Sequence, residues 1–152
     1  MSTNSLVAFS HEDGTVTSSY VHWDGYATGV GKTLLENYNS KELARELATT
    51  LGYASSLHET VAESHKGRAN TDEPEVHATF PDFEEVIVSN SFLEYVYVWD
   101  TSPLTNKWMV STWAQHITGE GKDVEFSEEW LGFEDLDELY AKEYIHQLKN
   151  DI

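Results

Sequence analysis

The chain has 152 residues, of which 39% are hydrophobic and 12% aromatic, and it carries a formal net charge of −18. This length fits one domain, and the aromatic content favours a packed core over disorder. The 27 acidic residues against 9 Lys and Arg disfavour direct binding to nucleic acids or anionic membranes, because both attract basic side chains. The chain has no cysteine, which excludes disulfides, thiolate metal sites and cysteine catalysis.

The excess negative charge lies mostly in the second half of the chain. Residues 72–100 carry eight acids and no Lys or Arg, and residues 120–152 carry eleven acids against three lysines. Such a surface either keeps a protein soluble or attracts a basic partner. No apolar run reaches the length of a membrane span or of a signal-peptide core, so we expect a cytoplasmic protein.

The N-terminal residues predict a β-hairpin. Ser5–Ser10 is apolar, Glu12-Asp13-Gly14 supplies a turn, and Thr15–Trp23 is rich in Thr, Val and Tyr. A glycine-rich loop from Asp24 to Gly31 follows, and then a short helix is expected over Thr33–Tyr38.

A second helix is predicted after this loop, with Asn39 or Ser40 as its cap and Gly52 at its end. Its apolar residues recur at positions 43, 44, 47, 48 and 51, which is a helical spacing. Residues 54–83 give the weakest pattern, with a helical piece near Leu57–Glu63 and a polar loop through Pro74.

The second half predicts a hairpin and a terminal helix. Leu93–Trp99 and Lys107–Trp113 alternate strongly and flank a turn that contains Pro103. Ser127 is expected to cap a turn at Glu128–Leu131, which Gly132 interrupts. The final helix is expected to align Phe133, Leu136, Tyr140, Tyr144 and Leu148 on one face, with Glu134, Asp135, Asp137 and Glu138 in its first turns.

This order of elements predicts a single α+β domain over residues 1–152. We expect an antiparallel β-sheet built from hairpins, with two to four helices packed on it. An exposed edge strand in the Leu93–Trp99 hairpin would also permit a homodimer.

Gly29-Val30-Gly31-Lys32-Thr33 is similar to part of a phosphate-binding loop. That motif needs its first glycine at position 26, where this chain has Tyr26. Nucleotide hydrolysis at this loop is therefore disfavoured. Binding of a small anion by Lys32 and the free amides of the helix start stays open.

Other catalytic patterns are incomplete. His58-Glu59 with Glu63 and His65 lacks a second histidine at position 62, where the zinc helix motif needs one. Pro81-Asp82 lacks the later lysine of a nuclease motif, and the chain has no Gly-x-Ser-x-Gly elbow. We therefore expect a protein that is not an enzyme and that holds neither metal nor cofactor.

The segment His22-Trp23-Asp24-Gly25-Tyr26 has two interpretations. Trp23 and Tyr26 could close the top of the core while Asp24 holds the turn, in which case Trp23→Ala would cost a few kcal/mol. Alternatively, the segment stacks on and hydrogen-bonds a planar ligand. The candidate ligand-binding residues are then His22, Trp23, Asp24, Tyr26 and Lys32.

Three stretches together carry a family resemblance: residues 20–26, 29–38 and 51–57. They resemble a family of small uncharacterised bacteriophage and prophage proteins, whose members share His-Trp-Asp-Gly-Tyr at a strand end and a Gly-x-x-Ser-Ser-Leu segment. The hairpin around Leu93–Trp99 resembles their second half, whereas residues 58–90 depart from them. The resemblance implies a viral or mobile-element origin, for which the expected location is the cytoplasm of the host cell, and it supplies no catalytic residues.

We therefore expect an acidic phage-type protein that binds and inhibits a host defence or nucleic-acid-processing protein, with carboxylates in place of nucleic-acid phosphates. The candidate partner-binding residues are Glu84, Glu85, Glu128, Glu129, Glu134, Asp135, Asp137 and Glu138. The alternative is a small-molecule binding protein that sequesters a nucleotide signal through the His22–Lys32 loop.

Overall fold

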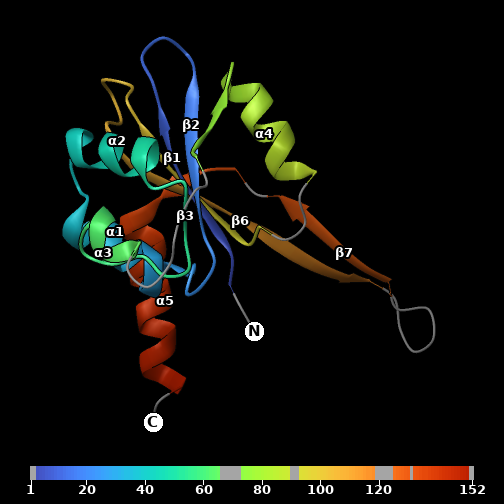
Figure 1. Ribbon diagram of the computed structural model, residues 1–152. Helices are drawn as coiled ribbons and strands as arrows, with labels where there is room; N and C mark the ends of the chain where they lie inside the picture. Colours follow the sequence, from blue (N-terminus) through green and yellow to red (C-terminus); the bar gives the residue numbers. More distant parts are fainter. Residues whose placement is uncertain (1–2, 66–72, 90–92, 119–124, 131, 151–152) are drawn as a thin grey trace.

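A mixed β-sheet with helices on both faces forms the centre of the protein (Figure 1). The computed structural model describes residues 3–65, 73–89, 93–118, 125–130 and 132–150. Its strands are β1 (Ser5–Ser10), β2 (Val16–Val21), β3 (Tyr53–Ala54), β4 (Glu75–His77), β5 (Tyr95–Asp100), β6 (Lys107–Thr118), β7 (Glu125–Trp130) and β8 (Glu134–Asp135). Its helices are η1 (Ala27–Gly31, a π-helical turn), α1 (Lys32–Asn37), α2 (Lys41–Thr50), α3 (Val61–Ser64), α4 (Phe80–Val88) and α5 (Leu136–Asn150).

Both predicted hairpins are confirmed, but the sheet that they build is mixed rather than antiparallel. β1 pairs antiparallel with β2, and β5 pairs antiparallel with β6. The two hairpins join through β1 and β5, which run parallel, with Ser5 opposite Tyr95 and Ser10 opposite Asp100. The first strand of each hairpin thus lies beside the first strand of the other, and these two strands run parallel. β5 is therefore an interior strand, and the exposed edge expected in the second hairpin is wrong.

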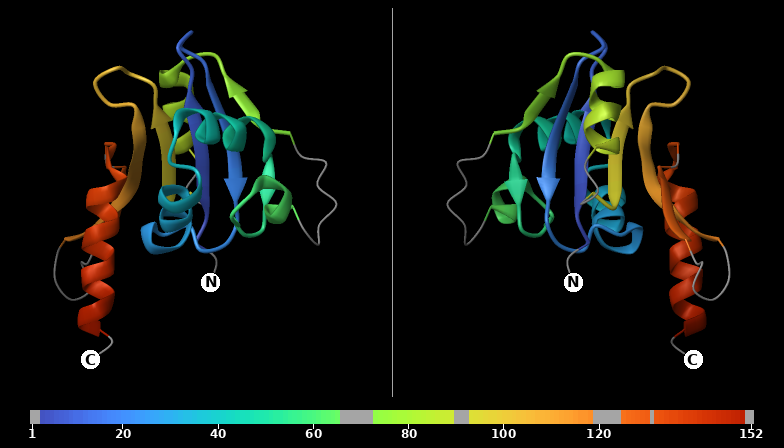
Figure 2. Two further views of the ribbon diagram at one scale, coloured as in Figure 1. Left: turned by 90° about the vertical axis from the view of Figure 1, so that its left-hand side faces the viewer. Right: turned by 90° about the vertical axis from the view of Figure 1, so that its right-hand side faces the viewer.

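Alternation along the central strands separates two apolar clusters. On β1, Val7 and Phe9 belong to one cluster, whereas Ala8 belongs to the other, with Leu6 packed against it. The first cluster lies under η1, α1, α2 and the start of α5, and we call this side of the sheet the covered face. The second cluster lies under α4, through Phe83 and Ile87, and we call this side the open face. Figure 2 shows α2 and α4 on opposite sides of the sheet.

Side-chain caps set the starts of three helices. Ser40 caps α2 by accepting a hydrogen bond from the amide of Leu43 at 3.2 Å, as the sequence predicts. Thr60 caps α3 and Thr79 caps α4 in the same way. The helix α4 was not predicted from the sequence. The described part of the chain has five α-helices, where two to four were expected.

The C-terminal segment differs from its prediction. The turn expected over 128–131 is the strand β7, paired with β6, and Leu131 lies outside the described residues. The helix begins only at Leu136, because Glu134 and Asp135 first pair with Val110 and Met109 at the sheet edge. On either side of this short strand, Phe133 packs on the open face and Leu136 packs on the covered face. α5 then runs past the end of the sheet, which leaves Tyr144 and Leu148 about half exposed.

Candidate functional site

The turn after β2 holds most of the predicted ligand residues, and its own contacts explain much of its structure. The Tyr26 hydroxyl donates to the Asp24 carboxylate at 2.9 Å, and the Tyr20 hydroxyl lies 3.0 Å from Nδ1 of His22. Asp24 has a φ of 59°, a backbone conformation that Asp tolerates better than most residues. Trp23 is 44% exposed, so its predicted place at the top of the core is wrong.

Tyr97 fills the place that the sequence suggested for Trp23. The Tyr97 side chain is fully buried, and its hydroxyl donates to the carbonyl oxygen of Gly25 at 2.5 Å. The backbone approaches so closely here that a Cβ on Gly25 would lie 2.6 Å from the carbonyl oxygen of Thr3. Because Tyr97 fills the core at this point, the Trp23 side chain, which follows the end of β2, lies on the protein surface.

The glycine-rich loop is helical, and its free amides already bind a carboxylate of the same chain. Oε1 of Glu143, on α5, accepts hydrogen bonds from the amides of Ala27 at 2.9 Å and Thr28 at 3.4 Å. Oε2 of Glu143 accepts a further bond from the Tyr95 hydroxyl at 2.8 Å. Burial, with the Glu143 hydrogen bond second, raises the pKa of Tyr95 well above its ordinary value. The position predicted for a small anion is therefore occupied by Glu143.

Lys32 stands apart from the other predicted ligand residues. Its ammonium group is exposed and lies 3.6 Å from the carboxylate of Glu36, one helical turn further on. It lines a hollow with His58 and Glu63, whereas His22, Trp23, Asp24 and Tyr26 share the turn that follows β2. The five candidate residues do not converge on one cavity among those described.

The histidines give no metal centre in the described part of the chain. His58 and Glu59 precede α3, and His65 is bonded through Nε2 to the carbonyl oxygen of Leu51 at 2.7 Å. Within the described ranges, no three His, Asp or Glu side chains gather closely enough to hold a metal ion.

The predicted partner-binding carboxylates are divided between different parts of the fold. Glu84 and Glu85 lie on α4 over the open face, whereas Asp137 and Glu138 lie in the first turn of α5. Glu128 and Glu129 lie on β7 opposite positions 115 and 114 of β6, and their side chains are outside the described part of the structure. The described side chains of this set therefore lie on separate elements, α4 on the open face and the segment from β8 into the first turn of α5.

Several acids are neutralised by neighbouring lysines. Lys107 forms an ion pair with Asp135 and holds the pKa of that carboxyl below its ordinary value of 3.8. Lys142 lies 3.6 Å from Glu134. Lys41 pairs with Glu12 at 2.5 Å. Residues 73–89, which form β4 and α4, contain five acids and neither Lys nor Arg; within this unit, Nε2 of His77 lies 3.9 Å from a carboxylate oxygen of Glu75.

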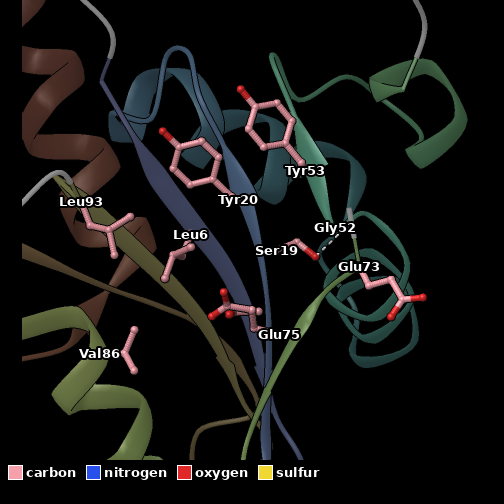
Figure 3. A pocket seen from close by; sticks show the side chains of 10 residues that line it. Leu6, Ser19, Tyr20, Gly52, Tyr53, Glu73, Glu75, Val86 and Leu93 are labelled. Atoms are coloured by element: carbon pink, nitrogen blue, oxygen red, sulfur yellow. Dashed lines mark hydrogen bonds between the residues drawn. The ribbon is translucent and has the colours of Figure 1, made fainter. Parts of the chain in front are cut away.

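The open face has two hollows beside α4. The first, of about 410 Å³, lies between β2, β3, β4 and α4, and we call it the tyrosine hollow (Figure 3). It is lined by Leu6, Ser18, Ser19, Tyr20, Gly52, Tyr53, Glu73, Glu75, Val86 and Leu93. The second, of about 350 Å³, lies on the other side of α4 and is lined by Ser10, Gly14, Phe80, Val98, Asp100, Met109 and Phe133. Within the described ranges, the nine-residue helix α4 thus leaves two hollows on this face.

Strand register explains the composition of the tyrosine hollow. Tyr20 is the register partner of Tyr53, and Ser18 is the register partner of Glu75, so all four belong to the open face. The two tyrosine rings lie 5.3 Å apart at 34°. Burial raises the pKa of Tyr20, with a smaller contribution from Tyr53. Below Glu75, the buried His77 lies 3.2 Å from the Ser18 hydroxyl. The sequence did not indicate this site, because β3 and β4 are too short to show an alternation of apolar and polar residues.

Comparisons with known proteins give no relative: no family model matches the chain, and searches of curated proteins and of solved structures find no match either. Among the described helices, none has the length and apolarity that crossing a bilayer requires.

Proposed function

We propose that this protein is not an enzyme and acts by binding a basic segment of another protein across its open face. The observation that carries the proposal is the unequal covering of the sheet. Among the described elements, α4 is the helix that covers the open face; the hollow beside Phe80 has mainly apolar walls, and the tyrosine hollow combines apolar, hydroxyl and carboxylate side chains. Such a combination of apolar walls and carboxylates matches a segment that combines apolar residues with Lys or Arg.

The charge of β4 and α4 supports a basic partner on physical grounds. Asp82, Glu84 and Glu85 all lie on α4, and Glu73 and Glu75 lie on or just before β4. Uncompensated carboxylates accelerate the encounter with a basic surface, and this acceleration weakens as salt is added. A partner surface that ordinarily contacts nucleic acid has the required charge, so binding here would compete with nucleic acid. This competition is the basis for proposing an inhibitor of a host defence or nucleic-acid-processing protein.

The alternative, sequestration of a nucleotide signal by the His22–Lys32 loop, has less support. The carboxylate of Glu143 already accepts hydrogen bonds from the amides that a phosphate would need. Lys32 lines a hollow with His58 and Glu63, away from the turn that holds Trp23. The origin in a phage or prophage stays a prediction from the sequence resemblance.

A pair of matched variants tests the proposal. Glu84→Gln/Glu85→Gln removes two charges from α4, and Glu42→Gln/Glu46→Gln removes two exposed charges from α2 on the covered face. Binding of fluorescently labelled octalysine is measured by anisotropy between low and high salt. We expect the α4 variant to lose several-fold more affinity than the α2 variant and to show the flatter salt dependence.

Equal losses in the two variants would contradict the proposal, because they would show that octalysine responds to net charge alone. Absence of octalysine binding at low salt would contradict it as well.

A further inference from the structure

We infer that the tyrosine hollow holds one cationic side chain of the partner, a lysine or an arginine, as the anchor of the basic segment. This inference rests on the proposed function and specifies the group that the site recognises. It follows from three features of the hollow: an apolar wall, an aromatic pair and a carboxylate directed into the cavity.

The apolar wall fits the alkyl part of a long basic side chain. Leu6 comes from β1, Val86 from α4, and Leu93 from the residues before β5, and all three line the same cavity (Figure 3). Leu93 is 2% exposed, whereas Val86 is 38% exposed, so the wall runs from the core to the surface. Lysine and arginine bury their methylene groups along such walls while the charged end stays near water.

The charged end is matched by Glu75. Its carboxylate points into the space between Leu6 and Val86 in Figure 3, and its side chain is 74% exposed. A hydrogen bond between a carboxylate and a cationic donor is stronger than one between neutral groups. Among the described residues that line the hollow, none is Lys or Arg. The described basic group nearest to Glu75 is the buried His77, whose Nε2 lies 3.9 Å from a carboxylate oxygen of Glu75.

The aromatic pair adds a surface that favours cations. Tyr20 and Tyr53 stand side by side at one end of the hollow, with their rings tilted by 34°. A cation placed over a tyrosine ring is attracted by the negative ring face. A tyrosine with its ordinary pKa of about 10 is already a neutral phenol at physiological pH, and burial raises the pKa of Tyr20 further. A volume of about 410 Å³ lies within the range of ordinary ligand sites.

Small probes isolate this anchor from the rest of the interface. We propose titrating the full-length protein, with its tyrosine rings ¹³C-labelled, with n-butylammonium, n-butylguanidinium and n-butanol at low salt. We expect both cations to shift the ring signals of Tyr20 and Tyr53, and n-butanol to shift them much less. Glu75→Gln should weaken cation binding by roughly two- to fivefold, the range that one partly exposed ion pair contributes. Glu42→Gln, which removes an equal charge from an exposed position of α2 on the covered face, should leave cation binding unchanged.

The result that overturns the inference is butanol shifting the two rings as strongly as the cations, or equal effects of Glu75→Gln and Glu42→Gln. The octalysine measurement separates the two proposals. If octalysine prefers the open face while the small cations ignore the hollow, the anchor is wrong and the proposed function stands. If the small cations bind in the hollow while octalysine shows no preference for α4, the proposed function fails on its own.

Discussion

The two faces of the sheet are built from the same strands, yet they are completed in different ways. On the covered face, η1, α1, α2 and the start of α5 close over an apolar core. Trp108 is 1% exposed and donates from its indole nitrogen to the carbonyl oxygen of Tyr38 at 3.0 Å. On the open face, α4 is the one described helix over the centre, and a hollow lies on each side of it. This difference indicates that the covered face supplies stability, whereas the open face has surface to which a partner could bind.

Charge follows the same division. The helices of the covered face carry lysines that pair with nearby acids, as Lys32 does with Glu36 and Lys41 does with Glu12. The unit of β4 and α4 has no such cation in residues 73–89. Unpaired like charges destabilise a compact state slightly, so their concentration on the incompletely covered face is consistent with a role in binding.

The largest expected effect is loss of the covered core. Trp108→Ala should lower the free energy of unfolding by roughly 3–5 kcal/mol, because it removes a fully buried ring and leaves a cavity. Val86→Ala, on the accessible side of α4, should cost less than about 1 kcal/mol. Urea denaturation of both variants measures the contrast. Similar losses in the two variants would show that the faces do not differ in stability.

The next effect concerns the carboxylate that holds α5 to η1. Glu143→Gln should cost about 1–2 kcal/mol, because an amide lacks the charge and places an NH₂ donor beside groups that are themselves donors. Glu138→Gln, at an exposed position of the same helix, is the matched control and should change stability little. Chemical denaturation compares them, and an equal effect of the two substitutions would remove Glu143 from the account of the covered face.

Trp23→Ala tests the exposed turn between the faces. Because the side chain is 44% exposed and Tyr97 fills the core below it, we expect a loss of less than about 1 kcal/mol. The sequence alone predicted a few kcal/mol. Thermal unfolding distinguishes the two values, and a large decrease in Tm would restore the core role that the sequence suggested.

The smallest effect concerns Asp135, at the edge where the chain passes from one face to the other. Its folded pKa lies below the ordinary 3.8 because Lys107 donates to it, so the pair contributes stability above that pH and loses it as the pH falls through the folded pKa. Asp135→Asn should therefore be slightly less stable than the parent protein at pH 7 and equal to it near pH 2. Urea midpoints at the two pH values measure this, and a constant difference would contradict the pairing.

The sequence predicted the elements that have local signals. Strand alternation identified β1, β2, β5 and β6, and the spacing of Ala44, Leu47 and Ala48 identified α2, with Ser40 as its cap. The start of α4 also has a sequence signal, because Thr79 and Pro81 are residues favoured at the start of a helix.

The sequence could not predict contacts between distant segments. Glu143 caps an amide 116 positions away, and no spacing rule relates the two residues. The parallel pairing of β1 with β5 brings together strands from separate hairpins, and the tyrosine hollow depends on two short strands beside β2. Trp23 was misplaced because a large aromatic residue is usually buried, whereas here Tyr97 closes the core from the other hairpin.

The most direct test of the central claim is to map where a basic peptide binds. Backbone amide shifts of ¹⁵N-labelled protein are recorded during titration with octalysine at low salt and again at high salt. The account predicts salt-sensitive shifts concentrated in β4, α4 and the residues around Tyr20 and Tyr53, with α1 and α2 unaffected. Shifts that are spread evenly over both faces, or that gather on α1 and α2, would contradict a binding role for the open face.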